Sequence, residues 1–458
     1  MTDAPTGTAV VLGASIGGAA TAAALAPYFA RVTVLDRDDL PDSPQKRKGV
    51  PHGYQFHTLT IGGRHAMEAL FPGLPDDLRK LGVPESCATA DVRYASKCGY
   101  FPRFESELMM LQPTRRLLEW YLRDRSSRLE GVDFVPNTTV TGLTAEDGAI
   151  TGVTAVDATG NEVAYEADLV VDTSGRASKT PDFLAALGYP APVEKTVNAR
   201  WGYATTYVRP PESWDPGFKS MYIGPTVSGE GPTATRGGAM WCQEDGQWVV
   251  TAQGCAGDYP PADPEGFRDY MGSFGSQAFT EVLDRFEIIS PFEAWRNTTN
   301  RLRDYAGLQS RPENLIVLGD ASAAFNPIYG QGMASAAMGA RLLREYLDEG
   351  ATLGAGFAEG FQKRLDEQVT QPCWAFSTGS DYAVPGVEVD GVTVDEADRP
   401  ESSYTDRVLA LATEDKEVTI KFWETVHILR GPEWMADEDL QNRVKADWDR
   451  LGNLSRKD

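Results

Sequence analysis

Histidine and cysteine are scarce in this chain of 458 residues, and neither type is clustered. The four histidines and five cysteines are His52, His57, His65 and His427, and Cys87, Cys98, Cys242, Cys255 and Cys373. A metal-binding knuckle needs closely spaced cysteines, and a disulfide framework is usually built from an even number of them. We therefore expect no metal site, no structural disulfide and a reducing, cytoplasmic location.

Positive charge is also in short supply. The sequence holds 43 Lys and Arg against 66 Asp and Glu, which gives a formal net charge of −23 and a pI of about 4.7. A surface of that sign repels phosphate backbones and anionic headgroups. We therefore expect neither nucleic acid nor an anionic membrane as a partner.

No cationic stretch precedes the longest uncharged run, which extends from Ala9 to Ala30. Its length alone would suit a membrane span, but its glycines and its serine predict a strand, a turn and a helix. We expect neither a signal peptide nor stable membrane insertion. A chain of this length is instead expected to form two or three soluble domains.

The uncharged run contains a glycine-rich turn. The apolar strand Ala9–Leu12 leads into Gly13, Ser15, Gly17 and Gly18, and an alanine-rich helix follows. Glycine permits a tight turn, and the helix start offers free N–H groups and a positive dipole end to phosphate oxygens. Ser15 stands where the usual pattern has a glycine, and it is small enough to let a phosphate approach. The turn therefore predicts a site for the pyrophosphate of a dinucleotide.

A second apolar strand, Val32–Leu35, ends at Asp36, and Arg37 follows. Asp36 lies 23 residues after Gly13, near the spacing of an acid that accepts hydrogen bonds from a ribose. An acid at this position disfavours a 2′-phosphate, so the nucleotide bound here is not NADP. Asp36 and Arg37 are both candidate cofactor-binding residues.

A second glycine-containing segment begins about 300 residues after the first. Asn314 is followed by the apolar run Leu315–Leu318, then by Gly319 and Asp320, and then by Asn326–Met333. An acid directly after a buried apolar run is expected to have a polar partner. The two segments indicate halves of one binding site, whereas a plain NAD-dependent dehydrogenase would leave the second segment unexplained.

Together with Asp168–Arg176, these segments resemble the FAD-dependent monooxygenases of the para-hydroxybenzoate hydroxylase fold. Lys48–His57 and Phe325–Met333 are most similar to the olefin epoxidases of polyether biosynthesis and their squalene-epoxidase-like relatives. The resemblance covers residues 8–365 in patches. It implies an α/β fold that has a Rossmann-like FAD-binding domain, an inserted β-rich substrate domain and a helical C-terminal region.

The resemblance also implies roles for individual residues. Arg115 would reach the FAD pyrophosphate from a helix start, although its neighbour Arg116 could equally make that contact. Asp172 and Gly175 would lie near the pyrophosphate in a motif that also serves NAD(P)H, although a turn aspartate explains Asp172 as well. Asp320, after Gly319, would accept a hydrogen bond from a ribityl hydroxyl. The turn beside the isoalloxazine ring would consist of Pro327, Gly330, Gln331, Gly332 and Met333.

We assign the chain to three parts. The FAD-binding domain is discontinuous and would comprise residues 1–80, 110–190 and 295–365. Residues 81–109 and 191–294 would form the substrate domain, and residues 366–458 a helical C-terminal cap.

The β-rich stretch carries the candidates for substrate binding. Strict alternation places Trp201, Tyr203 and Tyr207 on one face of a strand. The turn Asp245-Gly246 predicts a hairpin whose first strand contains Trp241. These four aromatic residues either line a substrate cavity or belong to a sheet face that packs on its neighbours.

The resemblance implies that the flavin carries the hard chemistry, so no protein residue is assigned as catalytic. A flavin hydroperoxide would transfer one oxygen atom of dioxygen to an electron-rich carbon. NAD(P)H would supply the electrons, directly or through a separate flavin reductase. No tryptophan motif of flavin-dependent halogenases is present.

The scarcity of histidine bears on the choice of reaction. Phenol hydroxylation benefits from a base, whereas olefin epoxidation needs none, and residues 191–294 contain no histidine. We therefore expect an epoxidase that acts on carbon–carbon double bonds of an apolar polyketide or terpenoid. The alternatives are an aromatic (phenol) hydroxylase of the same fold, a flavin-linked reductase and a non-catalytic ligand-binding flavoprotein.

Overall fold

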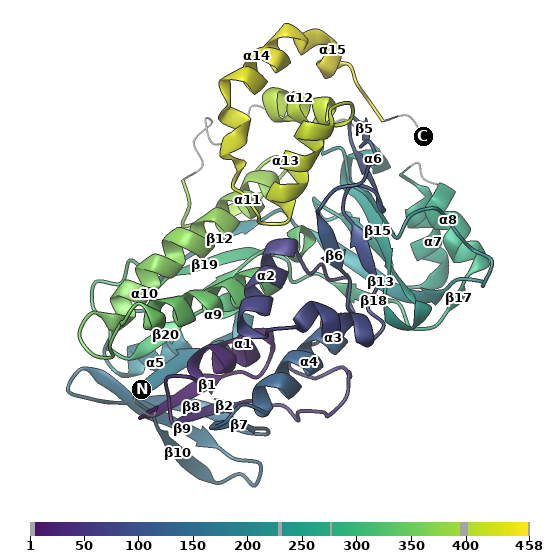
Figure 1. Cartoon of the computed structure of the whole chain (residues 1–458). Helices are drawn as coiled ribbons and strands as arrows, with labels where there is room; N and C mark the ends of the chain where they lie inside the picture. The colour runs from purple at the N-terminus through teal and green to yellow at the C-terminus, as the bar shows by residue number, and fades with distance from the viewer. Residues whose placement is uncertain (1–4, 228–230, 275–276, 394–401, 457–458) are drawn as a thin grey trace.

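The apolar N-terminal strand lies at the centre of a five-stranded parallel sheet (Figure 1). The computed structural model describes residues 5–227, 231–274, 277–393 and 402–456. The sheet has the strand order β20 (Leu315–Val317), β11 (Leu169–Asp172), β1 (Thr8–Leu12), β2 (Arg31–Leu35) and β7 (Val132–Val135). Its strands are almost continuously apolar because both faces of the sheet are covered.

Different layers bury the two faces of this sheet. Ala9 and Val11 belong to a core shared with helices on one side, whereas Val10 and Leu12 pack against a small antiparallel sheet on the other. The helices of this core are α1 (Ile16–Leu25), α9 (Gly332–Asp348) and α10 (Phe357–Leu365). Helix α4 (Arg115–Ser127) packs against α1 through a neighbouring core. The small sheet has the order β10 (Glu162–Glu166), β9 (Ala149–Val156) and β8 (Thr139–Glu146).

The uncharged run Ala9–Ala30 contributes β1 and α1, as the sequence predicts, and every residue of α1 is buried. Because alanine and glycine are small, α1 can pack closely between the parallel sheet and the helices α4 and α9. Across the described residues, none of the helices combines the length and apolar character that crossing a bilayer requires.

The second large unit is an eight-stranded sheet. Its main path is β17 (Glu287–Ile288), β13 (Gly202–Arg209), β16 (Trp248–Gly254), β15 (Arg236–Cys242), β14 (Ser220–Ile223), β4 (Val92–Ser96) and β5 (Gly99–Tyr100), and β18 (Glu293–Trp295) also pairs with β13. Helices α7 (Pro264–Gly272) and α8 (Gln277–Arg285) cover one face through an apolar core. Its other face is turned towards the parallel sheet and the segment 52–57.

The predicted hairpin is confirmed. Strands β15 and β16 pair antiparallel, with Cys242 opposite Trp248. Asp245 and Gly246 have φ angles of 63° and 65°, which is the left-handed pair that a tight hairpin turn requires.

Smaller elements connect the two large sheets. A four-stranded sheet has the order β21 (Ala323–Ala324), β19 (Asn300–Asp304), β12 (Val193–Asn198) and β22 (Glu388–Asp390). Strands β3 (Glu85–Cys87) and β6 (Met109–Leu111) form a ribbon, and helices α2 (Ile61–Leu70), α3 (Leu74–Lys80) and α5 (Thr180–Ala186) complete this part.

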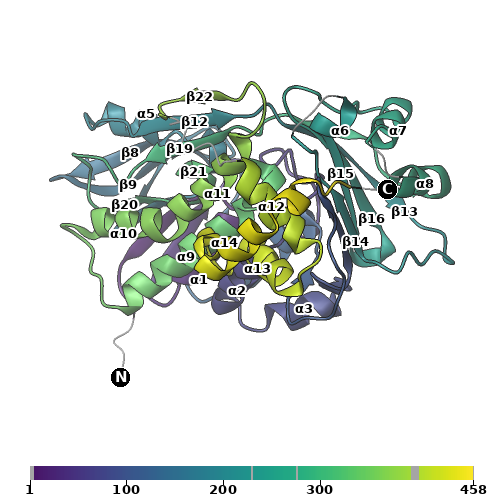
Figure 2. The same cartoon turned by 90° about the horizontal axis from the view of Figure 1, so that it is seen from above.

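Helices near the C-terminus lie above the junction of the two units (Figures 1 and 2). They are α11 (Gln371–Asp381), α12 (Ser402–Ala412), α13 (Lys416–Val426), α14 (Glu438–Ala446) and α15 (Trp448–Gly452). Phe422 and Trp423 of α13 contact the ring of Tyr94 on β4. The N–H of Gly62 on α2 donates to the carbonyl oxygen of His427 over 2.9 Å, so these helices touch both units.

Candidate active site

Four parallel strands end at one edge of the sheet, and the predicted site residues follow these ends. Gly13 follows β1, Asp36 follows β2, Asp172 ends β11 and Gly319 comes shortly after β20. The carboxyl edge of a parallel sheet is where open α/β folds bind their ligands. Residues from distant parts of the chain therefore meet at a single edge.

The turn between β1 and α1 has room only for glycine at two positions. Gly13 has a φ of +97°, and a Cβ on Gly18 would lie 1.8 Å from the carbonyl oxygen of Gly13. Ser15 precedes α1 but does not cap it, and the first turn holds no acidic residue. The Ser15 hydroxyl instead accepts from Arg115 (2.8 Å) and donates to Glu119 (3.2 Å). The first N–H groups of α1 thus remain free for a phosphate.

The two glycine-containing segments lie side by side, as the sequence predicts. A Cβ on Gly17 would lie 3.7 Å from the Cβ of Ala336, and a Cβ on Gly319 would lie 3.4 Å from the same atom. A Cβ on Gly332 would lie 3.5 Å from Oδ1 of Asp320. Helices α1 and α9 pack together, and this packing closes the distance between the segments.

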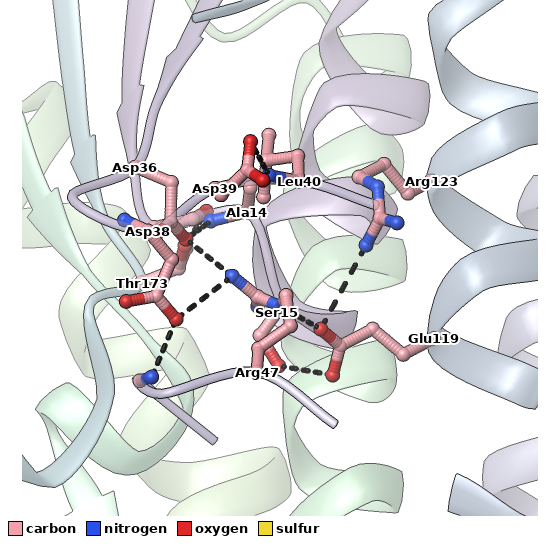
Figure 3. A network of polar contacts seen from close by, with 12 residues as sticks. Ala14, Ser15, Asp36, Asp38, Asp39, Leu40, Arg47, Glu119, Arg123 and Thr173 are labelled. Carbon is pink, nitrogen blue, oxygen red and sulfur yellow. Dashed lines mark hydrogen bonds and ion pairs between the residues drawn. The ribbon is translucent and has the colours of Figure 1, made fainter. Parts of the chain in front are cut away.

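Asp36 has protein partners and still has accepting capacity. Its Oδ2 accepts from the N–H of Ala14 over 2.7 Å, and its Oδ1 accepts from the N–H of Asp38 over 2.8 Å. Nη1 of Arg47 lies 3.4 Å from Oδ2 (Figure 3). A carboxylate offers about four acceptor sites, so a ribose hydroxyl can still bind. Arg37 is exposed, and the arginine beside Asp36 is Arg47.

Glu119 links three arginines in the interior. Its carboxylate lies 2.6 Å from Nε of Arg47, 2.5 Å from Nη1 of Arg115 and 3.8 Å from Nη1 of Arg123. Figure 3 shows Glu119 directed towards Arg47 and Arg123. Burial raises the pKa of Glu119, but the charges of Arg115 and Arg47 outweigh it and hold that pKa below its usual value. Glu119 is therefore ionised, and it orients the arginines nearest the phosphate turn.

A basic pocket opens beside this network. Its charged lining consists of Lys46, Arg47, Arg115, Arg116 and Arg123 and one acid, Glu119. Such a surplus of cations favours phosphate or another anionic group. Arg115 contacts the phosphate turn through Ser15, whereas the guanidinium of Arg116 lies 4.1 Å from the ring centre of Tyr54. Of the two arginines, Arg115 is therefore the better placed for a pyrophosphate.

Asp320 lies deep in the molecule, yet 35% of its side-chain surface is free. Nε of Arg176 lies 3.8 Å from Oδ2 of Asp320. Burial raises the pKa of Asp320, against the opposing charges of Arg176, Arg301 and Arg115. Arg176 also donates to the carbonyl oxygen of Phe325 over 2.6 Å. It therefore ties Asp320 to the start of the Phe325–Met333 segment.

Asp172 is used locally. Its carboxylate is fully buried and accepts from the N–H of Ser174 and from the hydroxyls of Ser178 and Thr180. Gly175, with a φ of +79°, begins the next turn. These contacts indicate that Asp172 stabilises the turn and orients the segment that carries Arg176. A contact of Asp172 or Gly175 with NAD(P)H stays a prediction.

The remaining glycine-turn candidates surround the start of α9. Pro327 begins a short 3₁₀ turn, Gly330 follows it with a φ of +68°, and Gln331 precedes α9. Oε1 of Gln331 is buried and has no hydrogen-bond partner among the described residues, which is the kind of group that a ligand satisfies. Gly332 and Met333 are the first residues of α9.

His52 and His57 lie between the two large units. Burial lowers the pKa of His52 to about 3, and the charges of Arg115 and Arg176 add to the effect. Burial also holds the pKa of His57 well below its usual value. Nδ1 of His57 lies 2.8 Å from the carbonyl oxygen of Gln55, which can only accept, so this nitrogen carries the proton. Both rings are neutral at pH 7 and are weak bases.

The four predicted substrate-binding aromatics are all buried, but their surroundings differ. Trp201 precedes strand β13 and packs with Cys255 and Val384, whereas Tyr207 and Trp241 lie on the face of the eight-stranded sheet that packs on segment 52–57. Trp241 stacks on Phe56 at 4.2 Å, and Tyr207 meets the edge of Tyr54 at 6.2 Å. Trp201 donates from its indole N–H to Asp381 over 2.8 Å. Trp201 and Tyr207 have neighbours that account for their burial, whereas the indole N–H of Trp241 is buried and has no hydrogen-bond partner among the described residues.

Tyr203 is the second of the four with a polar group that has no partner in the described part of the chain. Its hydroxyl makes no hydrogen bond among the described residues, and burial raises its pKa while the nearby charge of Arg176 opposes the rise. Of the four aromatic candidates, Tyr203 and Trp241 are therefore the two best placed to meet a substrate. Substrate contact for any of the four stays a prediction.

Sequence reasoning missed several residues that organise this site. Arg47 stands one residue before the Lys48–His57 segment, and the run of three basic residues Lys46-Arg47-Lys48 before Gly49 was a usable signal. Arg176 belongs to the Asp168–Arg176 segment but was not singled out. Glu119 and Asp381 carry no local signal, because their partners are remote in sequence.

This set of groups fits FAD. Free N–H groups and arginines meet at the phosphate turn, while Asp36 and Asp320 offer carboxylates at two separate places for ribose and ribityl hydroxyls. The start of α9 would lie at the isoalloxazine end. The fold and the site together define a flavoprotein with the architecture of FAD-dependent monooxygenases.

Sequence comparison supports this assignment. Residues 77–204 match the family described as FAD binding domain. The chain is 32% identical over 388 residues to protein Rv3254 of Mycobacterium tuberculosis, across 82% of this chain and 80% of the mycobacterial protein. It belongs to the family of that protein.

Solved structures confirm the expected α/β fold. A flavoprotein/dehydrogenase from Cytophaga hutchinsonii superposes with a TM-score of 0.62 at 15% identity, over 98% of each chain. PqsL, a probable FAD-dependent monooxygenase from Pseudomonas aeruginosa, superposes with a TM-score of 0.60 at 15% identity, over 82% of this chain and 97% of its own. At these identities the likeness establishes the fold.

Proposed function

We propose that this protein is a FAD-dependent monooxygenase that epoxidises carbon–carbon double bonds of an apolar polyketide or terpenoid substrate. FAD, when bound, accepts two electrons and lets one atom of dioxygen be transferred to the substrate. NAD(P)H supplies the electrons, directly or through a separate reductase. The protein binds the cofactor, positions the alkene and excludes water.

The observation that carries the proposal is that His52 and His57, which lie between the two large units, are weak bases. His52 has a pKa of about 3, and that of His57 is also well below the usual value. A base this weak takes little part in removing a proton from a phenol. Oxygen transfer to an alkene needs no such base, so these surroundings suit epoxidation better than phenol hydroxylation.

The apolar character of the substrate is inferred from the same face. Tyr207 and Trp241 belong to a buried cluster on the eight-stranded sheet, and the partly buried Phe56 of segment 52–57 packs against it. Binding sites for apolar ligands are lined mainly by such aromatic groups, with a few polar anchors. Arg176 and the hydroxyl of Tyr203 would be those anchors.

The test supplies purified protein with FAD, NAD(P)H or a flavin reductase, and a panel of polyenes and phenols under ¹⁸O₂. We expect an epoxide that contains one labelled oxygen. Efficient hydroxylation of phenols with an untouched alkene panel would replace this proposal with the aromatic hydroxylase.

Two further measurements separate the remaining alternatives. Saturation of a substrate double bond under anaerobic conditions would identify a flavin-linked reductase. Binding of FAD and of an apolar ligand, without any ligand-dependent oxygen consumption, would identify a non-catalytic ligand-binding flavoprotein.

A further inference from the structure

A buried acid outside every predicted site segment joins three parts of the molecule. Asp381, the last residue of α11, is only 1% exposed. Its Oδ1 accepts from Nε1 of Trp201 over 2.8 Å and from the hydroxyl of Tyr329 over 2.7 Å. Its Oδ2 accepts from Nδ2 of Asn300 over 2.7 Å, and Nδ2 of Asn326 lies 3.1 Å from the same oxygen. Four side chains from three separate segments thus donate to one carboxylate.

A second layer of hydrogen bonds extends this arrangement to the backbone of the Phe325–Met333 segment. Oδ1 of Asn300 accepts from the N–H of Asn326 over 2.7 Å and from the hydroxyl of Ser377 over 2.6 Å. Oδ1 of Asn326 accepts from the N–H of Ile328 over 3.2 Å, at the start of the Pro327–Tyr329 turn. The conformation of this turn therefore depends on groups that Asp381 holds.

All four donors are directed at the carboxylate of Asp381. This arrangement favours the ionised form of the group, because a carboxylate only accepts hydrogen bonds. A protonated acid would present a hydrogen to a group of N–H donors, and only the Tyr329 oxygen could accept it. Burial raises the pKa of Asp381 to about 6, although these hydrogen bonds oppose the rise. At pH 7 the group therefore carries a negative charge in the interior.

We propose that Asp381 is a positioning residue that holds the Asn326–Tyr329 turn, the expected isoalloxazine-side wall of the FAD site, in fixed relation to Trp201 on the substrate side. This inference rests on the proposed function, because it assumes that FAD places its flavin end beside this turn. The C-terminal segment thereby becomes part of the active site without touching the reacting atoms.

The geometry makes the arrangement sensitive to a minimal change. In Asp381→Asn an amide NH₂ replaces one of the two acceptor oxygens. In one orientation of the amide this NH₂ faces the side-chain NH₂ of Asn300, and in the other it faces the donors of Trp201 and Tyr329. Two donors without an acceptor between them cannot both be satisfied, and a buried unpaired polar group is costly. The turn then loses its anchor, and a buried negative charge is lost from the flavin end of the site.

The experiment compares holoenzymes of the unaltered protein, Asp381→Asn and a matched control, Asp415→Asn. Asp415 caps α13 by accepting from the N–H groups of Glu417 and Val418, and asparagine caps helices about as well as aspartate. The readouts are the dissociation constant for FAD, the visible spectrum of bound FAD and its reduction potential. A residue that only stabilised the fold would lower the melting temperature and leave the last two unchanged.

We expect Asp381→Asn to bind FAD at least tenfold more weakly, with an altered flavin spectrum and a more positive potential, because a buried anion disfavours adding electrons nearby. Asp415→Asn should match the unaltered protein in all three. Should Asp381→Asn fail to fold, Tyr329→Phe and Trp201→Phe each remove one donor, and both should weaken FAD binding.

The outcomes separate this inference from the proposed function. Unchanged affinity, spectrum and potential in Asp381→Asn would overturn the positioning role, and so would unchanged FAD affinity in the two single-donor variants. Failure of the unaltered protein to bind FAD would instead overturn the proposed function, and this inference with it.

Discussion

Nε of Arg47 donates to Oε1 of Glu119 over 2.6 Å, in a contact between residues 72 positions apart that are both buried. The pair connects the segment after β2 with the middle of α4. Because Glu119 also reaches Arg115 and Arg123, its loss would leave three buried or nearly buried cations without their shared partner.

Glu119→Gln should therefore destabilise the protein by roughly 3–5 kcal/mol, the usual cost of breaking a buried ion pair on one side. The folded-state pKa of Glu119 lies below the usual 4.5, so its contribution is present above pH 4.5 and is lost as the pH falls through the folded pKa. Urea unfolding at pH 7 and at pH 4 measures both effects. Glu281→Gln, which alters the exposed pair with Arg285, should change stability by about 0.5 kcal/mol or less.

Asp320→Ala should weaken FAD binding. The change removes a charge-assisted hydrogen bond worth roughly 1.5–3 kcal/mol, which corresponds to about a 10- to 150-fold rise in the dissociation constant. Titration of the apoprotein with FAD, followed by flavin fluorescence, measures it. Asp182→Ala, at a residue whose side chain is 70% exposed, is the control, and a folded Asp320→Ala with undiminished affinity would refute the assignment.

Acid should destabilise the protein through His427. This ring is 1% exposed and stacks on Trp423, and burial lowers its pKa from 6.5 to about 4. Below pH 6.5 His427 is protonated in the unfolded chain but stays neutral in the folded protein. The free energy of unfolding therefore falls by up to about 3 kcal/mol between pH 6.5 and 4.

His427→Phe keeps a ring stacked on Trp423 and removes the group that binds the proton. The free energy of unfolding of the variant should fall less steeply with acid over the same interval, as measured by urea titrations at pH 7, 5.5 and 4.5. His65→Gln, at an exposed position where burial and the charge of Arg64 lower the pKa of the ring less than at His427, should change the slope less than His427→Phe does. Equal slopes for His427→Phe and the unaltered protein would contradict the prediction.

Tyr203→Trp should change the choice of substrate more than the flavin content, because it enlarges a buried side chain that is predicted to bind substrate and whose hydroxyl makes no hydrogen bond among the described residues. The measurement compares FAD per protein chain with turnover across alkenes of graded size. Val208→Ile, on the opposite face of β13 against α7 and α8, is the control. Loss of FAD in parallel with turnover would show that Tyr203 supports the cofactor site instead.

Several features of the fold could be predicted because they depend on neighbours in the chain. The continuous apolar run Ala9–Leu12, the glycine turn and the acid after β2 each depend on only a few neighbouring residues. The same holds for Asp245-Gly246, where two left-handed residues define the hairpin turn. In each case a local backbone requirement restricts which residue types can occupy the position.

The candidate site was predicted only in part, because its electrostatic frame consists of long-range pairs. Arg37 is a predicted cofactor-binding residue because it follows Asp36 directly. In the structure Arg37 is exposed, and Arg47 lies beside the carboxylate of Asp36 instead. Nothing near Asp381 in the sequence signals its four donors, which come from β19, the Trp201 region and the Asn326–Tyr329 turn.

The sequence by itself determined the strand–turn–helix at Gly13–Gly18, the acids that follow two buried strands, and the mixed α/β class, since periodicity and turn chemistry are local properties. Only the tertiary structure decided which charges meet. Packing of α1 on α9 brings the two glycine segments together. Helix α4 carries Glu119 one turn after Arg115 and places it beside Arg47, and α11 places Asp381 next to the Asn326–Tyr329 turn. Such pairings depend on how whole elements pack in three dimensions, and no short stretch of residues encodes that packing.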